Sequence, residues 1–177
     1  VGFIVKKFIE FCGIILLIFS ILLLASLMSY APEDPNFIYS EKKEIKNLIG
    51  IQGSYISDLL LQSFGLIVFL VPVSSFVTGI NIFKTKKLLL LLENFFFIVL
   101  YLITGSLFLS LFYNESFLLS INGNGGFLGD YLKNLFINYE IITDNFFYFI
   151  FIFLIILFFF ISINLNKKKI VNLILNL

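Results

Sequence analysis

The sequence contains no histidine, arginine or tryptophan, and it has a single cysteine, Cys12. One cysteine cannot close an intrachain disulfide, and without histidine the chain lacks a cysteine–histidine metal site and the commonest general base. Charged residues make up only 13% of the 177 positions, against about 25% in ordinary soluble domains. With 60% hydrophobic residues and a mean hydropathy of +1.06, this composition excludes a soluble enzyme and a disordered chain. It predicts an integral membrane protein, and the net charge of +1 argues against a nucleic-acid-binding surface.

Four apolar stretches are long enough to cross a bilayer as helices, which takes about 20 residues. They cover about 11–29, 59–83, 88–112 and 146–163. The last stretch is rich in residues that favour strands, but a membrane-spanning strand needs only about 9–11 residues, so its length predicts a helix. The first stretch is too long for the apolar part of a cleaved signal peptide. We therefore predict an all-α integral membrane protein with four transmembrane helices.

The lysines indicate how these helices are oriented. Eight of the twelve lysines flank the amino end of the first helix, the link between the second and third, and the carboxyl end of the fourth. Since short lysine-rich segments stay in the cytoplasm, both termini are predicted to be cytoplasmic. Two loops then face outward, between helices one and two and between helices three and four.

The first outer loop contains several turn and capping signals. Pro32 and Pro35 cannot continue a helix, so the first helix is predicted to end before them. Residues 40–50 are predicted to form a short surface helix, with Gly50 just after its end. Ser57 or Asp58 is predicted to cap the start of the second helix, where a carboxylate is also favoured.

The second outer loop has a glycine-rich stretch at 122–129. It lacks the preceding strand, the glycine spacing and the Lys-Ser/Thr of a phosphate-binding loop, so we assign it no nucleotide. Apolar residues then recur at helical spacing from Phe127 to Phe136, which predicts a short amphipathic helix at the outer interface or packed on the bundle.

Glu93 is the carboxylate that lies within a predicted span, and an intramembrane carboxylate is a candidate functional site. Two interpretations stay open: a structural role, for example bonding to Thr78 or Asn81 at matching depth, and an ion or proton role. Pro72 is interpreted as a tolerated kink in the second helix. Glycines predicted to allow close helix packing are Gly65 and Gly79.

A set of motif residues follows in order between and within these helices, and the same residues are the interaction candidates: Tyr30, Asp34, Pro35, Asn47, Gly50, Gly53, Asp58, Gly65, Gly125, Gly126 and Gly129. This set resembles the amino-terminal four-helix membrane domain of the FtsK/SpoIIIE family of bacterial DNA translocases. The resemblance covers nearly the whole chain, and the third and fourth helices match by hydropathy alone. The chain has Phe37 where members of the family often have tryptophan.

The resemblance implies a function in division and chromosome segregation. It implies a multi-pass anchor in the bacterial cytoplasmic (inner) membrane at the division septum, in contact with the lipid bilayer and other division proteins and homo-oligomeric in the full-length protein. The family's motor needs a Walker A loop, which this sequence does not contain, so we expect no catalytic residue, no cofactor and no direct DNA contact here. ATP and magnesium are expected only for the motor. Residues 1–166 are interpreted as the membrane domain and 167–177 as the start of a linker. The alternative is a small transporter or channel subunit that uses Glu93.

Overall fold

The computed structural model describes residues 2–36, 44–115, 119, 121–136 and 145–163, and these are helical or irregular, with no strand among them. The helices in chain order are α1 (Phe3–Met28), α2 (Ile51–Phe64), the 3₁₀ helix η1 (Gly65–Phe69), α3 (Leu70–Thr85), α4 (Leu89–Phe112), α5 (Gly126–Phe136) and α6 (Asn145–Ser162). The runs Phe3–Met28, Ile51–Thr85 and Leu89–Phe112 are long and apolar enough to cross a membrane, and α6 is a shorter apolar helix. This confirms the predicted all-α fold with four apolar helical segments.

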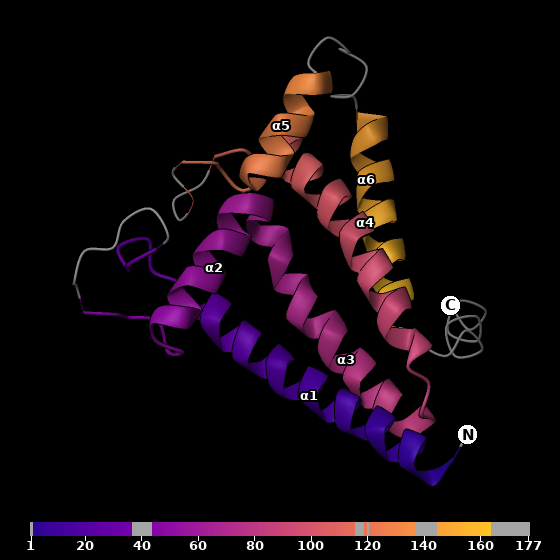
Figure 1. Cartoon of the computed structure of the whole chain (residues 1–177). Coiled ribbons are helices and arrows are strands. Elements are labelled where there is room, and N and C mark those ends of the chain that lie inside the picture. Colours follow the sequence, from indigo (N-terminus) through magenta and orange to yellow (C-terminus); the bar gives the residue numbers. More distant parts are fainter. Residues whose placement is uncertain (1, 37–43, 116–118, 120, 137–144, 164–177) are drawn as a thin grey trace, which may run out of the picture.

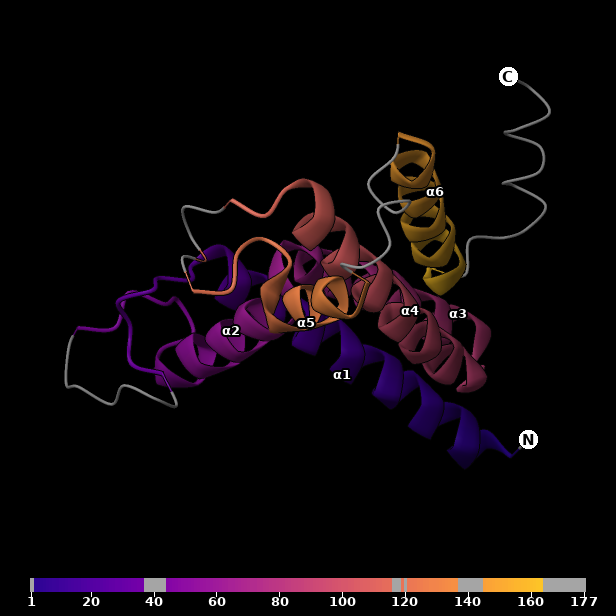
Figure 2. The same cartoon turned by 90° about the horizontal axis from the view of Figure 1, so that it is seen from above.

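The four segments pack as two pairs joined at the centre. α1 packs along α3, α6 packs along α4, and α3 contacts α4. Viewed from above, α1 and α6 lie at opposite sides of the arrangement (Figure 2). α1 and α3 approach closely at two glycines, because a Cβ on Gly13 would lie 3.0 Å from the carbonyl oxygen of Gly79. The predicted close approach at Gly79 is thus present, and its partner in α1 is also a glycine.

The second apolar segment is broken, which the sequence did not predict. The helix begins at Ile51, eight residues before the expected start, and the backbone turns at Gly65 with φ +74° and ψ −160°. Pro72 is not the kink: it is the third residue of α3, in the first turn, where a missing N–H leaves no helical hydrogen bond unmade. The break at Gly65 directs α2 away from α3 (Figure 1).

Two further predictions for the first loop are wrong. Of the expected surface helix over 40–50, residues 44–50 are not helical, and 40–43 lie outside the described residues. Gly50 does not end a helix but precedes α2, with φ +75° and ψ −154°. Ser57 and Asp58 both lie inside α2 and so do not cap its start.

The buried core lies where α1, α2, η1 and α4 meet. Its members are Leu23, Leu27, Leu61, Val68, Ile98, Tyr101, Leu102 and Leu119. On the opposite face of α1, side chains such as Phe11, Ile18 and Leu22 are about half exposed, as expected for helices surrounded by lipid.

The chain has two chemically different ends, a lysine end and a loop end. The lysine end carries Lys6, Lys7, Lys84, Lys86 and Lys87, next to the start of α1 and the α3–α4 turn. The loop end comprises residues 29–36 and 44–64, the Gly65 break, and residues 113–115, 119 and 121–136. The predicted amphipathic helix is confirmed as α5 at this end. It packs on α4 and α2 and leaves Phe127, Tyr131 and Leu135 more than half exposed.

Candidate functional site at the loop end

Asp34 and Asn47 fasten the first loop to the helices beneath it. The Asp34 carboxylate accepts hydrogen bonds from the backbone N–H groups of Lys46 and Asn47, both at 2.9 Å. The Asn47 side-chain amide donates to the carbonyl oxygen of Ser26 in α1 at 2.9 Å. Asp34 is 5% exposed and Asn47 is 4% exposed, so each buried polar group has partners, as stability requires.

Small residues bring α1 and α2 together below this loop. The Ser26 hydroxyl donates to the carbonyl oxygen of Gly53 at 2.7 Å, and the Ser54 hydroxyl donates to that of Pro35 at 2.6 Å. A Cβ on Gly53 would lie 2.2 Å from the Asn47 side-chain oxygen, so this contact needs glycine. Four residues of the family motif set therefore belong to one hydrogen-bonded cluster: Asp34, Pro35, Asn47 and Gly53.

A second chain of hydrogen bonds connects the two loops. The Tyr30 hydroxyl donates to the Asp58 carboxylate at 3.0 Å and accepts from the Gln62 side-chain amide at 3.2 Å. The Gln62 side-chain oxygen in turn accepts from Asn122 at 3.0 Å. Burial, with a smaller contribution from the neighbouring Asp58, raises the pKa of Tyr30 to about 12. Asp58 thus acts as an acceptor for Tyr30, which local capping rules did not suggest.

The glycine motif of the second loop fits against the break in the second helix. The backbone N–H of Leu66 donates to the carbonyl oxygen of Asn124 at 2.9 Å. A Cβ on Gly65 would lie 1.9 Å from that same oxygen, and a Cβ on Gly126 would lie 2.5 Å from the Gly65 nitrogen. Gly126 also has a positive φ, +67°. The Gly65 motif and the Gly125–Gly129 motif are therefore the two sides of one backbone contact.

The same loop packs on a small-residue face of α4. A Cβ on Gly125 would lie 2.2 Å from the Ser110 hydroxyl, and one on Gly129 would lie 2.3 Å from the Ser106 carbonyl oxygen. Ser110 donates to the Asp130 carboxylate at 2.9 Å, and Ser106 donates to the carbonyl oxygen of Phe64 at 2.7 Å. These serines are not among the predicted site residues, although their spacing of four residues in an apolar helix indicates a shared face.

Three uncharged polar residues within the membrane spans, Thr78, Asn81 and Asn94, donate hydrogen bonds to the end of α6. They do not bond to Glu93. Thr78 and Asn94 both donate to the carbonyl oxygen of Ser162 at 3.2 Å, and Asn81 donates to that of Ile163 at 2.9 Å. Asn94 is 3% exposed, whereas its neighbour Glu93 is only half-buried. The bond from Glu93 to Thr78 or Asn81, given above as one example of a structural role, is therefore not formed: these side chains satisfy the last carbonyls of α6, which otherwise have no helical partner.

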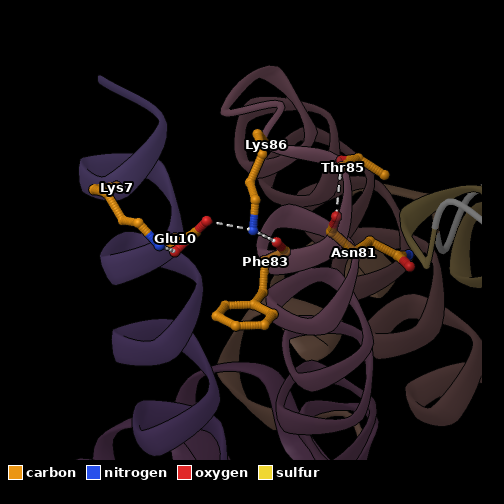
Figure 3. A network of polar contacts seen from close by, with 6 residues as sticks. All are labelled: Lys7, Glu10, Asn81, Phe83, Thr85 and Lys86. Carbon is orange, nitrogen blue, oxygen red and sulfur yellow. Dashed lines mark hydrogen bonds and ion pairs between the residues drawn. The ribbon is translucent and has the colours of Figure 1, made fainter. Parts of the chain in front are cut away.

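At the lysine end, one carboxylate ties α1 to the α3–α4 turn (Figure 3). Glu10 forms ion pairs with Lys7 at 2.9 Å and with Lys86 at 2.8 Å. Lys86 also donates to the carbonyl oxygen of Phe83 and lies 4.4 Å from the centre of its ring. Lys86 has φ +58°, an arrangement that ends α3, so its side chain and its backbone both fix this turn.

Within the described part of the chain, no three histidine, cysteine, aspartate or glutamate residues lie together as a metal site would require. The arrangement at the loop end is instead a polar and glycine-based junction whose groups satisfy one another. The candidate residues from Tyr30 to Asp58 gather in the first part of this junction, and Gly65 with Gly125, Gly126 and Gly129 forms the second part.

The family model for the 4TM region of DNA translocase FtsK/SpoIIIE matches residues 5–171. The chain belongs to this family. Among curated relatives, it is similar to "DNA translocase FtsK" of Rickettsia typhi, with 35% identity over 124 residues, which cover 70% of the chain and 17% of the relative. The protein of the same description from Rickettsia prowazekii is 34% identical over 126 residues, 71% of the chain and 17% of the relative.

A third relative, "DNA translocase FtsK" of Rickettsia bellii, is 39% identical over 74 residues, 42% of the chain and 10% of the relative. The chain thus spans less than a fifth of the length of these FtsK proteins. No solved structure matches it. The match to the 4TM region confirms the resemblance and identifies the chain as a multi-pass membrane domain and not as the FtsK motor domain.

Proposed function

We propose that the chain is the membrane-anchoring and septum-targeting domain of an FtsK-type DNA translocase that acts in cell division and chromosome segregation. The observation that carries this proposal is the 4TM match over residues 5–171. The gathering of the motif residues into one junction at the loop end supports it. In this role the segment binds no cofactor and does not touch DNA, and ATP and magnesium belong to the motor.

The charge distribution supports an orientation in the bacterial inner membrane. Of the seven lysines that the structure describes, five (positions 6, 7, 84, 86 and 87) lie at one end, and Lys46 and Lys133 lie at the loop end. Lysine-rich ends stay in the cytoplasm. Asp34, Asp58 and Asp130 lie at the other end, in hydrogen bonds to the loops. The lysine end is therefore assigned to the cytoplasm and the loop end to the outer face.

A fixed loop end suits recognition by other division proteins. Two loops far apart in the sequence are held by a common set of hydrogen bonds, so the exposed residues of α5 are presented in one arrangement. Phe127 and Tyr131 are exposed aromatic side chains on this helix, and aromatic side chains are enriched at protein interfaces. We assign the contacts with division partners to this end, and homo-oligomerisation to the full-length protein.

A fluorescent fusion of the segment tests the targeting. We expect it to collect at mid-cell, and we expect Gly126→Val to weaken that localisation because the added side chain collides with the Gly65 backbone. Phe127→Ser removes an exposed aromatic ring and leaves the contact between Gly126 and Gly65 intact. It therefore distinguishes the loss of a surface side chain from the loss of the folded loop end. Membrane insertion and abundance are measured for each variant. Uniform membrane fluorescence of the intact segment would refute septum targeting.

Reconstitution tests the alternative of transport through Glu93. In the proposed role, vesicles that contain the segment show no proton or solute flux above the empty vesicles, and Glu93→Gln changes nothing. Flux that disappears in Glu93→Gln would favour a transporter or channel subunit over the anchor.

A further inference from the structure

A cavity of about 170 Å³ lies between the end of α1 and the break in the second segment. It is lined by Leu27, Met28, Tyr30, Leu61, Leu66, Phe69 and Leu119. Among these side chains only Tyr30 carries a strong hydrogen-bonding group, and its hydroxyl is already bonded to Asp58 and Gln62. Since a buried water needs two to four polar partners, these side chains provide too few hydrogen-bonding groups to hold a water molecule in the cavity.

The depth of the cavity in the membrane can be estimated along two helices, α1 and α3, and both estimates place it in the hydrocarbon core. On α1 the charged residues end at Glu10, and Leu27 lies 16 residues beyond Phe11, about 24 Å along the axis. On α3 the lysines begin after Phe83, and Phe69 lies 14 residues before it, about 21 Å along the axis. Even a helix tilt of about 40° leaves about 16 Å of depth. In a core about 30 Å thick, the cavity therefore lies in the leaflet next to the loop end.

The cavity reaches the surface beside Met28. Leu27, Leu61 and Leu119 are at most 2% exposed and form its deep wall, whereas Met28 is 72% exposed. At the depth derived above, the medium that meets Met28 is lipid hydrocarbon and not water. The unbranched methionine side chain adapts readily to a neighbour, so it suits the rim of an entrance.

We propose that this cavity binds the end of a lipid acyl chain from the leaflet at the loop end. A dry apolar cavity of about 150 Å³ in another protein takes up benzene, so this one accommodates a segment of about six carbons. The guest restores the dispersion contacts that the cavity wall would otherwise lack. The bound chain then joins the end of α1, the Gly65 break and Leu119, and becomes part of the loop-end junction.

Photo-crosslinking in vesicles tests this site. The segment is reconstituted with a phosphatidylcholine that carries a diazirine at the end of one acyl chain, and adducts are mapped by mass spectrometry. A second lipid carries the diazirine near the carboxyl end of the chain. We expect the chain-end probe to label the 61–69 stretch at least fivefold more than the second probe does.

Cavity-filling variants complete the test. Leu119→Phe, or Leu66→Phe if the first variant does not insert, is expected to reduce chain-end labelling of the 61–69 stretch at least fivefold. The matched control Leu22→Phe adds the same ring at a lipid-facing position, 47% exposed, and is expected to leave this labelling unchanged. Labelling of the outward face of α1 serves as the folding control. Equal labelling of 61–69 by both probes, or labelling that survives filling of the cavity, would overturn the proposal.

Discussion

Replacing Gly65 by alanine places a methyl group 1.9 Å from the carbonyl oxygen of Asn124, which is too close for two non-bonded atoms. That oxygen accepts the hydrogen bond from Leu66 N–H, so the second loop must move and the bond must lengthen or break. Gly65 also has φ +74° and ψ −160°, a region that residues with a Cβ rarely occupy. The substitution therefore combines backbone strain with a collision between two segments.

Gly50 provides a matched control for this substitution. Its φ of +75° and ψ of −154° nearly equal those of Gly65, but a Cβ there meets nothing within 4 Å. Gly50→Ala thus carries only the backbone strain, about 1–3 kcal/mol. Gly65→Ala carries the same strain, about 1–3 kcal/mol of overpacking and about 0.5–1.5 kcal/mol for the hydrogen bond.

The assay is unfolding of both variants and the parent chain in the same lipid nanodiscs, followed by circular dichroism. We expect Gly65→Ala to lower the free energy of unfolding by about 1.5–4.5 kcal/mol more than Gly50→Ala does. Equal losses in the two variants would show that Gly65 does not contact the second loop. The account of the glycine motifs as two sides of one backbone contact would then be wrong.

Three further changes test other parts of the structure. In steric-trapping measurements, Asn94→Leu is expected to lower the free energy of unfolding by about 0.6–1.7 kcal/mol, from the average to the maximum for hydrogen bonds between membrane helices. Glu93→Gln should lower it by less, and the reverse order would contradict the role of Asn94 in holding α6. Asp34→Asn supplies one acceptor oxygen where the carboxylate supplies two, so the first loop should be cleaved faster by protease. A cleavage rate equal to that of the parent chain would contradict the role of Asp34 in holding this loop. The raised pKa of Tyr30 favours its neutral phenol in the folded state. The free energy of unfolding is therefore unaffected by this group below about pH 10 and falls as the pH rises toward 12. Tyr30→Phe should lessen that fall, and a pH profile identical to that of the parent chain would refute the role of Tyr30.

Local patterns in the sequence were sufficient to predict the four apolar segments as helical, although not the break in the second one. A run of about 20 apolar residues has few alternatives to a transmembrane helix, because unpaired backbone groups are too costly in hydrocarbon. The apolar spacing from Phe127 to Phe136 likewise predicted α5, which the structure places at Gly126–Phe136. These features depend on residues close in sequence, so periodicity and composition determine them.

The tertiary structure decided how the motif residues work. Asp58 and Ser57 look like caps from their neighbours alone, yet Tyr30, 28 residues away, uses Asp58 as its acceptor. Gly65 turns the second segment because the loop around Asn124 packs against it, while Pro72 falls harmlessly in a first turn. Likewise, Thr78, Asn81 and Asn94 serve the carbonyls of α6, 68 to 84 residues further on. A buried donor takes whichever acceptor the packed fold brings within reach, and separation along the chain carries no information about which one that is.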